Sequence, residues 1–198
     1  KLNFLNKVLY SIREGSFKLL VSGGVNSDSK IIINRNIMDR VNKIAPFLSY
    51  DEDPYAVVVN GKIYYIIDGY TTTKYFPYAE PFNENANYIR NSFKVIVDAY
   101  NGDVDYYIVD EKEPLVETYS KIFPKLFKPM SDMPKEFVSH LRYPQTMFDI
   151  QAKMYGTYHT NQPDIFYNRE DKWEIAKQNY QGKIQEMESL YFTFELPD

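Results

Sequence analysis

The chain has 198 residues, of which 44% are hydrophobic and 25% are charged, and its net charge is −4. This composition supplies a hydrophobic core and excludes an intrinsically disordered segment. The absence of Cys excludes disulfides, thiol catalysis and thiolate metal sites. No run of about 18 apolar residues occurs, so the sequence predicts no membrane-spanning segment within this chain.

The charge is unevenly distributed along the chain. Residues 1–49 hold eight Lys or Arg and three Asp or Glu, a net charge of +5, whereas residues 50–198 hold 15 and 24, a net charge of −9. We therefore expect no nucleic-acid binding by the main body. The basic part is either a solvated helical face or a segment that lies near anionic lipid.

The first 49 residues are predicted to be helical apart from a loop at 25–29, and residues 31–33 fit either a strand or a helix. Apolar residues recur at helical spacing from Leu2 to Ile12 and again from Ile37 to Ala45, where Pro46 ends the pattern. We expect residues 1–49 to form a basic helical segment that packs on a domain made by residues 50–198. The chain opens without Met or a signal-peptide pattern, which suggests a piece of a longer polypeptide.

Two copies of one hairpin pattern follow, at residues 55–68 and 93–110. In each, a β-branched and aromatic run meets Asn-Gly, at 60–61 and 101–102, and turns back into a second run. Asn-Gly favours a type I′ turn, because both central residues need positive φ. The second copy has one extra residue, which is consistent with a bulge.

Helices are predicted after the hairpins. Apolar spacing indicates helices at 114–122, 134–141 and 144–159, and Asn168 is interpreted as the N-cap of a helix that continues through Trp173 to Ala176. Strict alternation over 190–196 predicts a final strand that joins the sheet. The predicted fold class is α+β: an antiparallel sheet built from two Asn-Gly hairpins plus a C-terminal strand, covered by N-terminal and C-terminal helices.

No motif identifies a reaction, a metal or a cofactor. The two histidines, His140 and His159, lack the converging ligands of a zinc site, and no nucleophile elbow or phosphate-binding loop occurs. The carboxylate cluster at 51–53 is interpreted as a solvated turn before a strand rather than a Ca²⁺ site. We therefore predict no catalytic residue, no metal and no cofactor.

The sequence does suggest a ligand-binding surface. The 19 Tyr are typical either of half-buried sheet and helix faces or of a recognition surface. Arginine binds carboxylates bidentately, although an internal ion pair with Asp68 or Asp98 is the competing interpretation. If Asp68 and Asp110 approached each other, acid–base chemistry would also become possible. The candidate ligand-binding residues are Asp68, Tyr70, Arg90, Asn91, Arg142 and Tyr143.

An ordered set of short motifs runs through the chain. They are Lys-Ile-Ala-Pro-Phe-Leu (43–48), Asp-Pro-Tyr (53–55), Asp-Gly-Tyr-Thr (68–71), Tyr-Phe-Pro-Tyr (75–78), Asn-Tyr-Ile-Arg-Asn-Ser (87–92), Val-Asp-Ala-Tyr-Asn-Gly (97–102), Phe-Pro-Lys-Leu-Phe (123–127), Ser-Asp-Met-Pro (131–134), His-Leu-Arg-Tyr-Pro (140–144), Tyr-His (158–159) and Phe-Tyr-Asn-Arg-Glu-Asp-Lys-Trp (166–173). Together they resemble uncharacterised protein family 0182, which consists of large bacterial integral membrane proteins of unknown function. Gly69 stands where Ala is usual in that family.

The resemblance implies a location but no activity. It implies a block of membrane helices that precedes this chain, attachment to the plasma membrane, and an extracytoplasmic position for this part. The expected function is a soluble extracytoplasmic interaction or ligand-binding domain, whose partners are its own membrane domain and an envelope protein or ligand. The alternatives are a carboxylate-dependent envelope hydrolase and a scaffold that assembles the membrane domain without binding a ligand.

Overall fold

The structure, a computed structural model, describes residues 2–192 and 194–195. The chain divides into two compact units, Lys1–Lys43 and Ile44–Asp198. The first unit contains the predicted N-terminal helices, which are α1 (Phe4–Arg13), α2 (Lys18–Val21) and α3 (Ile37–Ile44), the last of which ends one residue into the second unit. Residues 22–36 form no helix, which agrees with the loop predicted at 25–29, and residues 31–33 form neither a helix nor a strand. The packing of residues 1–49 on the remaining domain stays a prediction.

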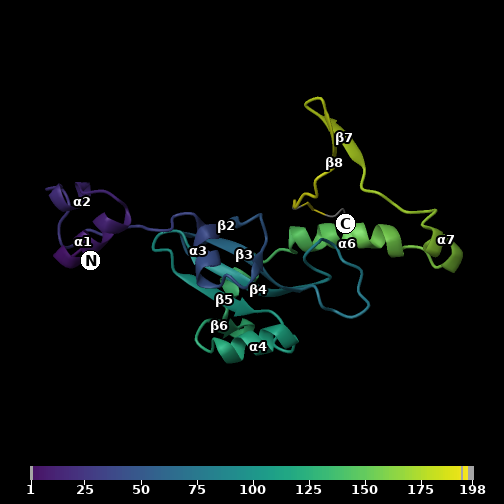
Figure 1. The fold of residues 1–198 in the computed structure, drawn as a ribbon, viewed down its shortest axis with the longest axis horizontal. Helices are drawn as coiled ribbons and strands as arrows, with labels where there is room; N and C mark the ends of the chain where they lie inside the picture. Colours follow the sequence, from purple (N-terminus) through teal and green to yellow (C-terminus); the bar gives the residue numbers. More distant parts are fainter. Residues whose placement is uncertain (1, 193, 196–198) are drawn as a thin grey trace. The chain divides into compact units, whose positions relative to one another are not determined.

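The second unit is built on one six-stranded sheet (Figure 1). The strand order is β1-β3-β4-β5-β6, and β2 also pairs with β3. All neighbouring strands are antiparallel except β5 and β6, which are parallel. The strands are β1 (Ser49–Tyr50), β2 (Tyr55–Val59), β3 (Lys62–Thr73), β4 (Tyr88–Asp98), β5 (Val104–Ile108) and β6 (Phe127–Pro129). The predicted α+β fold class with a mostly antiparallel sheet is confirmed.

Both predicted hairpins are present, but only one has the predicted turn. In the β2–β3 hairpin, Asn60 and Gly61 have φ values of 50° and 73°, as a type I′ turn requires. In the β4–β5 hairpin Gly102 has positive φ and Asn101 does not. There Asp98 Oδ1 accepts hydrogen bonds from the amides of Tyr100 and Asn101, which stabilises a longer loop.

Each face of the sheet has its own core. On one face Val57, Val59, Ile66, Ile96 and Tyr107 pack with Met133 and Phe137, which come from the segment that holds η1 (Met130–Asp132) and α5 (Lys135–Val138). On the other face Phe93 stacks on Phe127 with ring centroids 4.7 Å apart. Phe47 stacks on Phe123, which follows α4 (Pro114–Ile122). The sheet is therefore covered on both faces, in agreement with the alternating burial along β2 and the continuous burial of residues 92–97 in β4.

Two elements near the C-terminus differ from the prediction. Asn168 is the last residue of α7 (Pro163–Asn168) rather than an N-cap, because Pro163 opens the helix and Arg169 ends it in the left-handed region at φ 55°. The residues at 190–192 and 194–195 form no strand, and 193 and 196 lie outside the described residues. The outermost strands of the sheet are β1, β2 and β6, and none of them pairs with these described residues, so the predicted C-terminal strand of the sheet is wrong there. A small separate hairpin, β7 (Lys177–Tyr180) and β8 (Lys183–Glu186), precedes it.

Candidate functional site

The candidate site is a cleft between β4 and the start of α6 (Gln145–Tyr158), which we call the β4–α6 cleft. Its volume is about 510 Å³. Four of the six predicted ligand-binding residues line it, two from β4 and two from the segment just before α6. These four are Arg90, Asn91, Arg142 and Tyr143. The fold thus brings together two pairs of residues that are about 50 positions apart in the sequence.

The fifth predicted residue, Asp68, lies beneath this cleft in a buried ion pair. It stands opposite Lys94 in the β3–β4 register and accepts a hydrogen bond from the Lys94 ammonium group. Asn91 Nδ2 also donates to Asp68 Oδ1 at 2.8 Å. Burial raises the pKa of the Asp68 carboxyl, although Lys94 and Asn91 act in the opposite direction. Asp68 therefore supports the cleft and does not present a free carboxylate to a ligand.

A bulge in β4 makes this arrangement possible. Gly69 pairs with Phe93 while the next residue, Tyr70, pairs with Asn91, so Ser92 is the extra residue. In a regular strand, residues three apart point to opposite faces of the sheet. The extra residue turns the side chains of Asn91 and Lys94 to the same face, where both reach Asp68.

Lys94 also joins the sheet to the opposite wall of the cleft. Its ammonium group donates to the carbonyl oxygen of Arg142 at 3.1 Å. The amide of Arg142 in turn donates to the hydroxyl of Tyr55 at 3.2 Å. The main chain at Arg142 is thus held from both sides, which fixes the segment that carries Tyr143.

The sixth predicted residue, Tyr70, is buried and has a structural role. Its hydroxyl donates to Asp51 Oδ2 at 2.5 Å, and the same oxygen accepts the amide of Thr146 at 3.1 Å. Burial and the adjacent carboxylate of Asp51 raise the pKa of Tyr70. The prediction that residues 51–53 form a solvated turn is wrong for Asp51, whose side chain is buried where it ties β3 to the start of α6.

Arg142 has an unusual environment for a surface cation. Its guanidinium carbon lies 4.4 Å from the ring centroid of Tyr55 and 4.6 Å from that of Tyr191. Contact with two aromatic rings stabilises the cation and orients its planar group. In the part of the chain that the structure describes, neither Arg142 nor the exposed Arg90 forms an ion pair, so the expected pairing of these arginines with Asp68 or Asp98 is not found.

Apart from the apolar side chains of Ile89, Val109, Pro144 and Met147, the remaining lining of the cleft includes polar groups that already form hydrogen bonds. The Tyr143 hydroxyl donates to Gln151 Oε1 at 2.6 Å. Glu113 caps α4 by accepting the amide of Val116 and also accepts the hydroxyl of Tyr88. Asp110 accepts the amide of Lys112. The two carboxylates that line the cleft therefore serve a helix cap and a turn.

Acid–base and metal chemistry receive no support from the geometry. Asp68 is in β3 and Asp110 follows β5, and β4 separates these two strands. No cluster of His, Asp and Glu side chains among residues 2–192 and 194–195 could hold a metal ion. None of the eight tyrosines in the six-stranded sheet is exposed, because Tyr70, Tyr106 and Tyr107 are buried and the other five are half-buried. The expected Tyr-rich open surface is therefore much smaller than the composition suggests.

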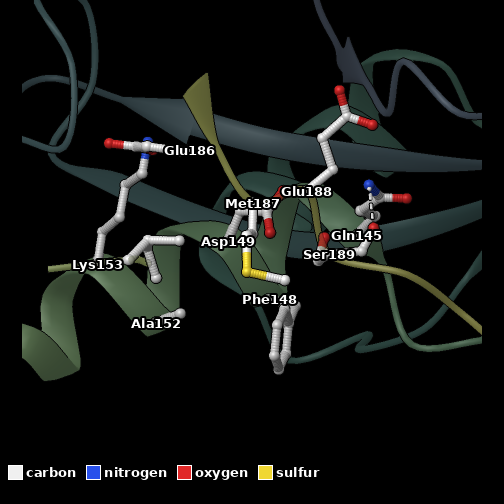
Figure 2. Close-up of a pocket in the computed structure, with 10 residues that line it drawn as sticks. Gln145, Phe148, Asp149, Ala152, Lys153, Glu186, Met187, Glu188 and Ser189 are labelled. Carbon is white, nitrogen blue, oxygen red and sulfur yellow. Dashed lines mark hydrogen bonds and ion pairs between the residues drawn. The ribbon is translucent and has the colours of Figure 1, made fainter. Parts of the chain in front are cut away.

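Helix α6 also lines a second, smaller hollow on the side of the C-terminal segment (Figure 2). Its volume is about 280 Å³. Lys153 forms an ion pair with Glu186 at 3.4 Å across it, and the side chain of Gln145 donates to the carbonyl of Ser189 at 3.1 Å. Figure 2 shows Phe148 and Met187 next to each other between these polar contacts. Because the Lys153–Glu186 ion pair and the Gln145–Ser189 hydrogen bond span it, this hollow is a place where residues 186–189 contact α6.

Sequence reasoning missed Lys94 and Asp51, the two residues that hold the site together. A lysine inside the otherwise apolar run Phe-Lys-Val-Ile-Val at 93–97 is the one sequence signal for a buried ion pair. Its partner could not be inferred, because a long loop joins β3 to β4 and leaves their register open. Asp51 is hidden in a run of three acidic residues, of which Glu52 and Asp53 are indeed exposed.

Comparison with known proteins identifies the family. The sequence model of an uncharacterised protein family, UPF0182, matches residues 1–198. The chain belongs to this family. It is similar to UPF0182 proteins from Alkaliphilus metalliredigens (56% identity over 194 residues), Pelotomaculum thermopropionicum (51% over 195 residues) and Methanospirillum hungatei (50% over 203 residues). No solved structure matches the chain.

The similarity covers nearly all of this chain but only part of each relative. The matched region is 98–100% of the chain and 21–23% of these three relatives. The family resemblance predicted from the motifs is confirmed. Within the described residues, no helix combines the length and the apolar character that crossing a bilayer requires.

Proposed function

We propose that this chain is an extracytoplasmic ligand-binding or interaction domain of a larger bacterial membrane protein, and that the β4–α6 cleft is its binding site. The membrane context is supported by the family resemblance of the motifs. It is also supported by the size of the relatives, because a match of about a fifth of their length leaves room for a membrane domain. The same resemblance supports an extracytoplasmic position.

The observation that carries the binding proposal is the convergence of Arg90, Asn91, Arg142 and Tyr143 on one cleft. Two of these residues are arginines without an ion-pair partner among the described residues. A guanidinium group binds a carboxylate or phosphate through two parallel hydrogen bonds. We therefore propose a ligand that carries a carboxylate or phosphate group.

Binding is favoured over hydrolysis by the state of the carboxylates. A glycosidase needs two carboxyl groups that flank the substrate, roughly 5–9.5 Å apart and free to exchange protons. In the β4–α6 cleft Glu113 and Asp110 accept structural hydrogen bonds, and the buried Asp68 is paired with Lys94. An arrangement of this kind stabilises a binding wall and leaves no free acid–base pair.

Ligand-linked stabilisation tests this proposal. Thermal unfolding of the 198-residue chain is measured with increasing citrate and with inorganic phosphate as probes. A ligand present at about 100 times its dissociation constant stabilises the folded state by about 2.7 kcal/mol. We expect a rise in Tm with at least one probe, and loss of most of that rise in Arg90→Ala.

Lys62→Ala is the matched control, because Lys62 is also exposed and lies outside the cleft. Its Tm should rise as much as that of the unchanged chain. Equal loss in both variants would mean that the anion acts through overall charge, and no rise with either probe would contradict an anionic ligand.

Accessibility labelling tests the compartment. This chain has no native Cys, so Tyr78→Cys in the full-length protein places one thiol at a fully exposed loop position of this domain. We expect a membrane-impermeant maleimide to label it in intact cells. Labelling that requires permeabilised cells would contradict the extracytoplasmic position.

A further inference from the structure

Helix α1 exposes its apolar face instead of its polar one. Four of its apolar side chains, Phe4, Leu5, Leu9 and Ile12, are 55–79% exposed. These positions lie within one arc of the helix, because residues three or four apart fall on the same face. The residues opposite this arc, Asn6, Lys7 and Tyr10, are half-buried, and Ser11 at its edge is buried with no hydrogen-bond partner for its hydroxyl. An amphipathic helix normally has the reverse orientation.

The exposed apolar surface continues beyond α1. Phe17, which precedes α2, and Val21 at its end are one helical turn apart and are 77% and 84% exposed. Helices α1 and α2 contact each other within the first unit. Six large apolar side chains exposed along two helices that contact each other indicate an interaction site.

The charge around this surface points to its occupant. The first unit contains eight Lys or Arg and three Asp or Glu, a net charge of +5, whereas the rest of the chain is acidic. Arg13 and Lys18 are exposed; Arg13 directly follows Ile12, and Lys18 lies between Phe17 and Val21 in the sequence. An exposed apolar helix face combined with exposed basic residues is the pattern of a helix that lies in the interface of an anionic bilayer.

The dimensions allow a helix that lies on a membrane and exclude one that crosses it. Helix α1 has 10 residues and is therefore about 15 Å long, half the thickness of the hydrocarbon core. A buried protein–protein contact would instead deplete charged residues from the surface. The mixed apolar and basic character thus favours a lipid surface over a protein groove.

We propose that residues 2–24 place the exposed apolar face of α1 and α2 on the surface of an anionic lipid bilayer. This inference rests on the first unit alone and is independent of the β4–α6 cleft. The apolar side chains enter the acyl boundary while Arg13 and Lys18 contact the phosphate groups.

The test is co-sedimentation of the 198-residue chain with vesicles of phosphatidylcholine alone and of phosphatidylcholine mixed with phosphatidylglycerol. We expect binding to the anionic vesicles that weakens as salt is added. The double variant Leu9→Ser/Ile12→Ser should lower that affinity at least about tenfold, because two apolar side chains are lost from the contact. Both positions are exposed, so folding should be unchanged in circular dichroism.

The double variant Val58→Ser/Ile184→Ser is the control, since both residues are at least as exposed as Leu9 and lie in the second unit. It should bind like the unchanged chain. Absence of binding to anionic vesicles would overturn the proposal. So would a dimer in sedimentation velocity that Leu9→Ser/Ile12→Ser dissociates, because the face would then be a contact between copies.

Discussion

Lys94 holds three parts of the second unit together. Its ammonium group contacts the Asp68 carboxylate in β3 and the carbonyl of Arg142 ahead of α6, and its own main chain is in β4. Lys94 and Asp68 are almost fully buried. A buried pair of this kind costs desolvation energy when it forms. Its effect on the free energy of unfolding is therefore best measured by replacing one of the two partners.

Removal of the Lys94 charge should be strongly destabilising. Lys94→Met leaves the Asp68 carboxylate buried without its cation, and we expect a loss of about 3–5 kcal/mol in the free energy of unfolding, measured by urea titration. Lys128→Met is the matched control, because Lys128 pairs with Asp105 at 2.7 Å but is half exposed. That exposed pair should contribute less than about 1 kcal/mol. Equal losses in the two variants would show that Lys94 is not a buried structural cation.

Buried tyrosine hydroxyls predict alkaline sensitivity. Burial raises the pKa of Tyr50 and of Tyr55 to about 12, from an ordinary value of 10. Between pH 10 and pH 12 the unfolded chain loses these protons while the folded chain keeps them. The stability that these groups contribute is therefore complete below pH 10 and is lost as the pH rises through 12.

We expect Tm to fall steeply between pH 10 and pH 12. We also expect part of the tyrosinate absorbance of the folded chain to appear at a higher pH than in the unfolded chain. Tyr50→Phe should make the fall less steep, since one buried proton is removed from the linkage, although its hydrogen bond to the Ala45 carbonyl is also lost. A Tm that does not change from pH 10 to pH 12 would contradict the buried state of these hydroxyls.

At the scale of elements, the β2–β3 hairpin depends on two residues in the left-handed region. Gly61→Ala places a side chain at φ 73° and should lower the free energy of unfolding by about 1–2 kcal/mol. Gly61→Asn is the control, because Asn tolerates this conformation and should cost clearly less. Urea titration of both variants measures the difference. An Ala variant as stable as the Asn variant would indicate that the turn is not type I′.

Elements with local signals were predictable from the sequence, and elements that depend on distant partners were not. Asn-Gly between two alternating runs predicts the β2–β3 hairpin. Pro114 and the helical spacing of the apolar residues that follow it predict α4. The parallel strand β6 is only three residues long and forms because β5 offers it an edge. Because β6 forms only when the rest of the sheet is present, the sequence of these three residues does not predict a strand.

The same reason explains the result for the candidate site. Arg90, Asn91, Arg142 and Tyr143 were chosen as candidates by residue type, and the fold gathers them in one cleft. Burial of Tyr70 and Asp68 was not predictable, because it depends on the bulge at Ser92 and on the segment that covers β3 and β4. Polar residues on adjacent strands can line a site or lie beneath it, and only the tertiary contacts distinguish the two.

At the scale of the molecule, the chain consists of two units with opposite net charge and separate expected roles. The basic unit at 1–43 exposes an apolar helix face, and the acidic unit at 44–198 contains the β4–α6 cleft. The proposal for the β4–α6 cleft and the proposal for the apolar face of the first unit are independent of each other. A variant in one unit should therefore leave the binding property of the other unchanged.

The most direct measurement of the central claim is an NMR titration of the 198-residue chain with citrate, because it locates the binding site instead of only detecting binding. Amide signals of residues 89–94, 142–143 and 145–147 should shift together, while the indole signal of Trp173, which lies outside the cleft lining, should not move. Shifts confined to the region around Trp173, or no shift in either wall of the β4–α6 cleft, would contradict the account.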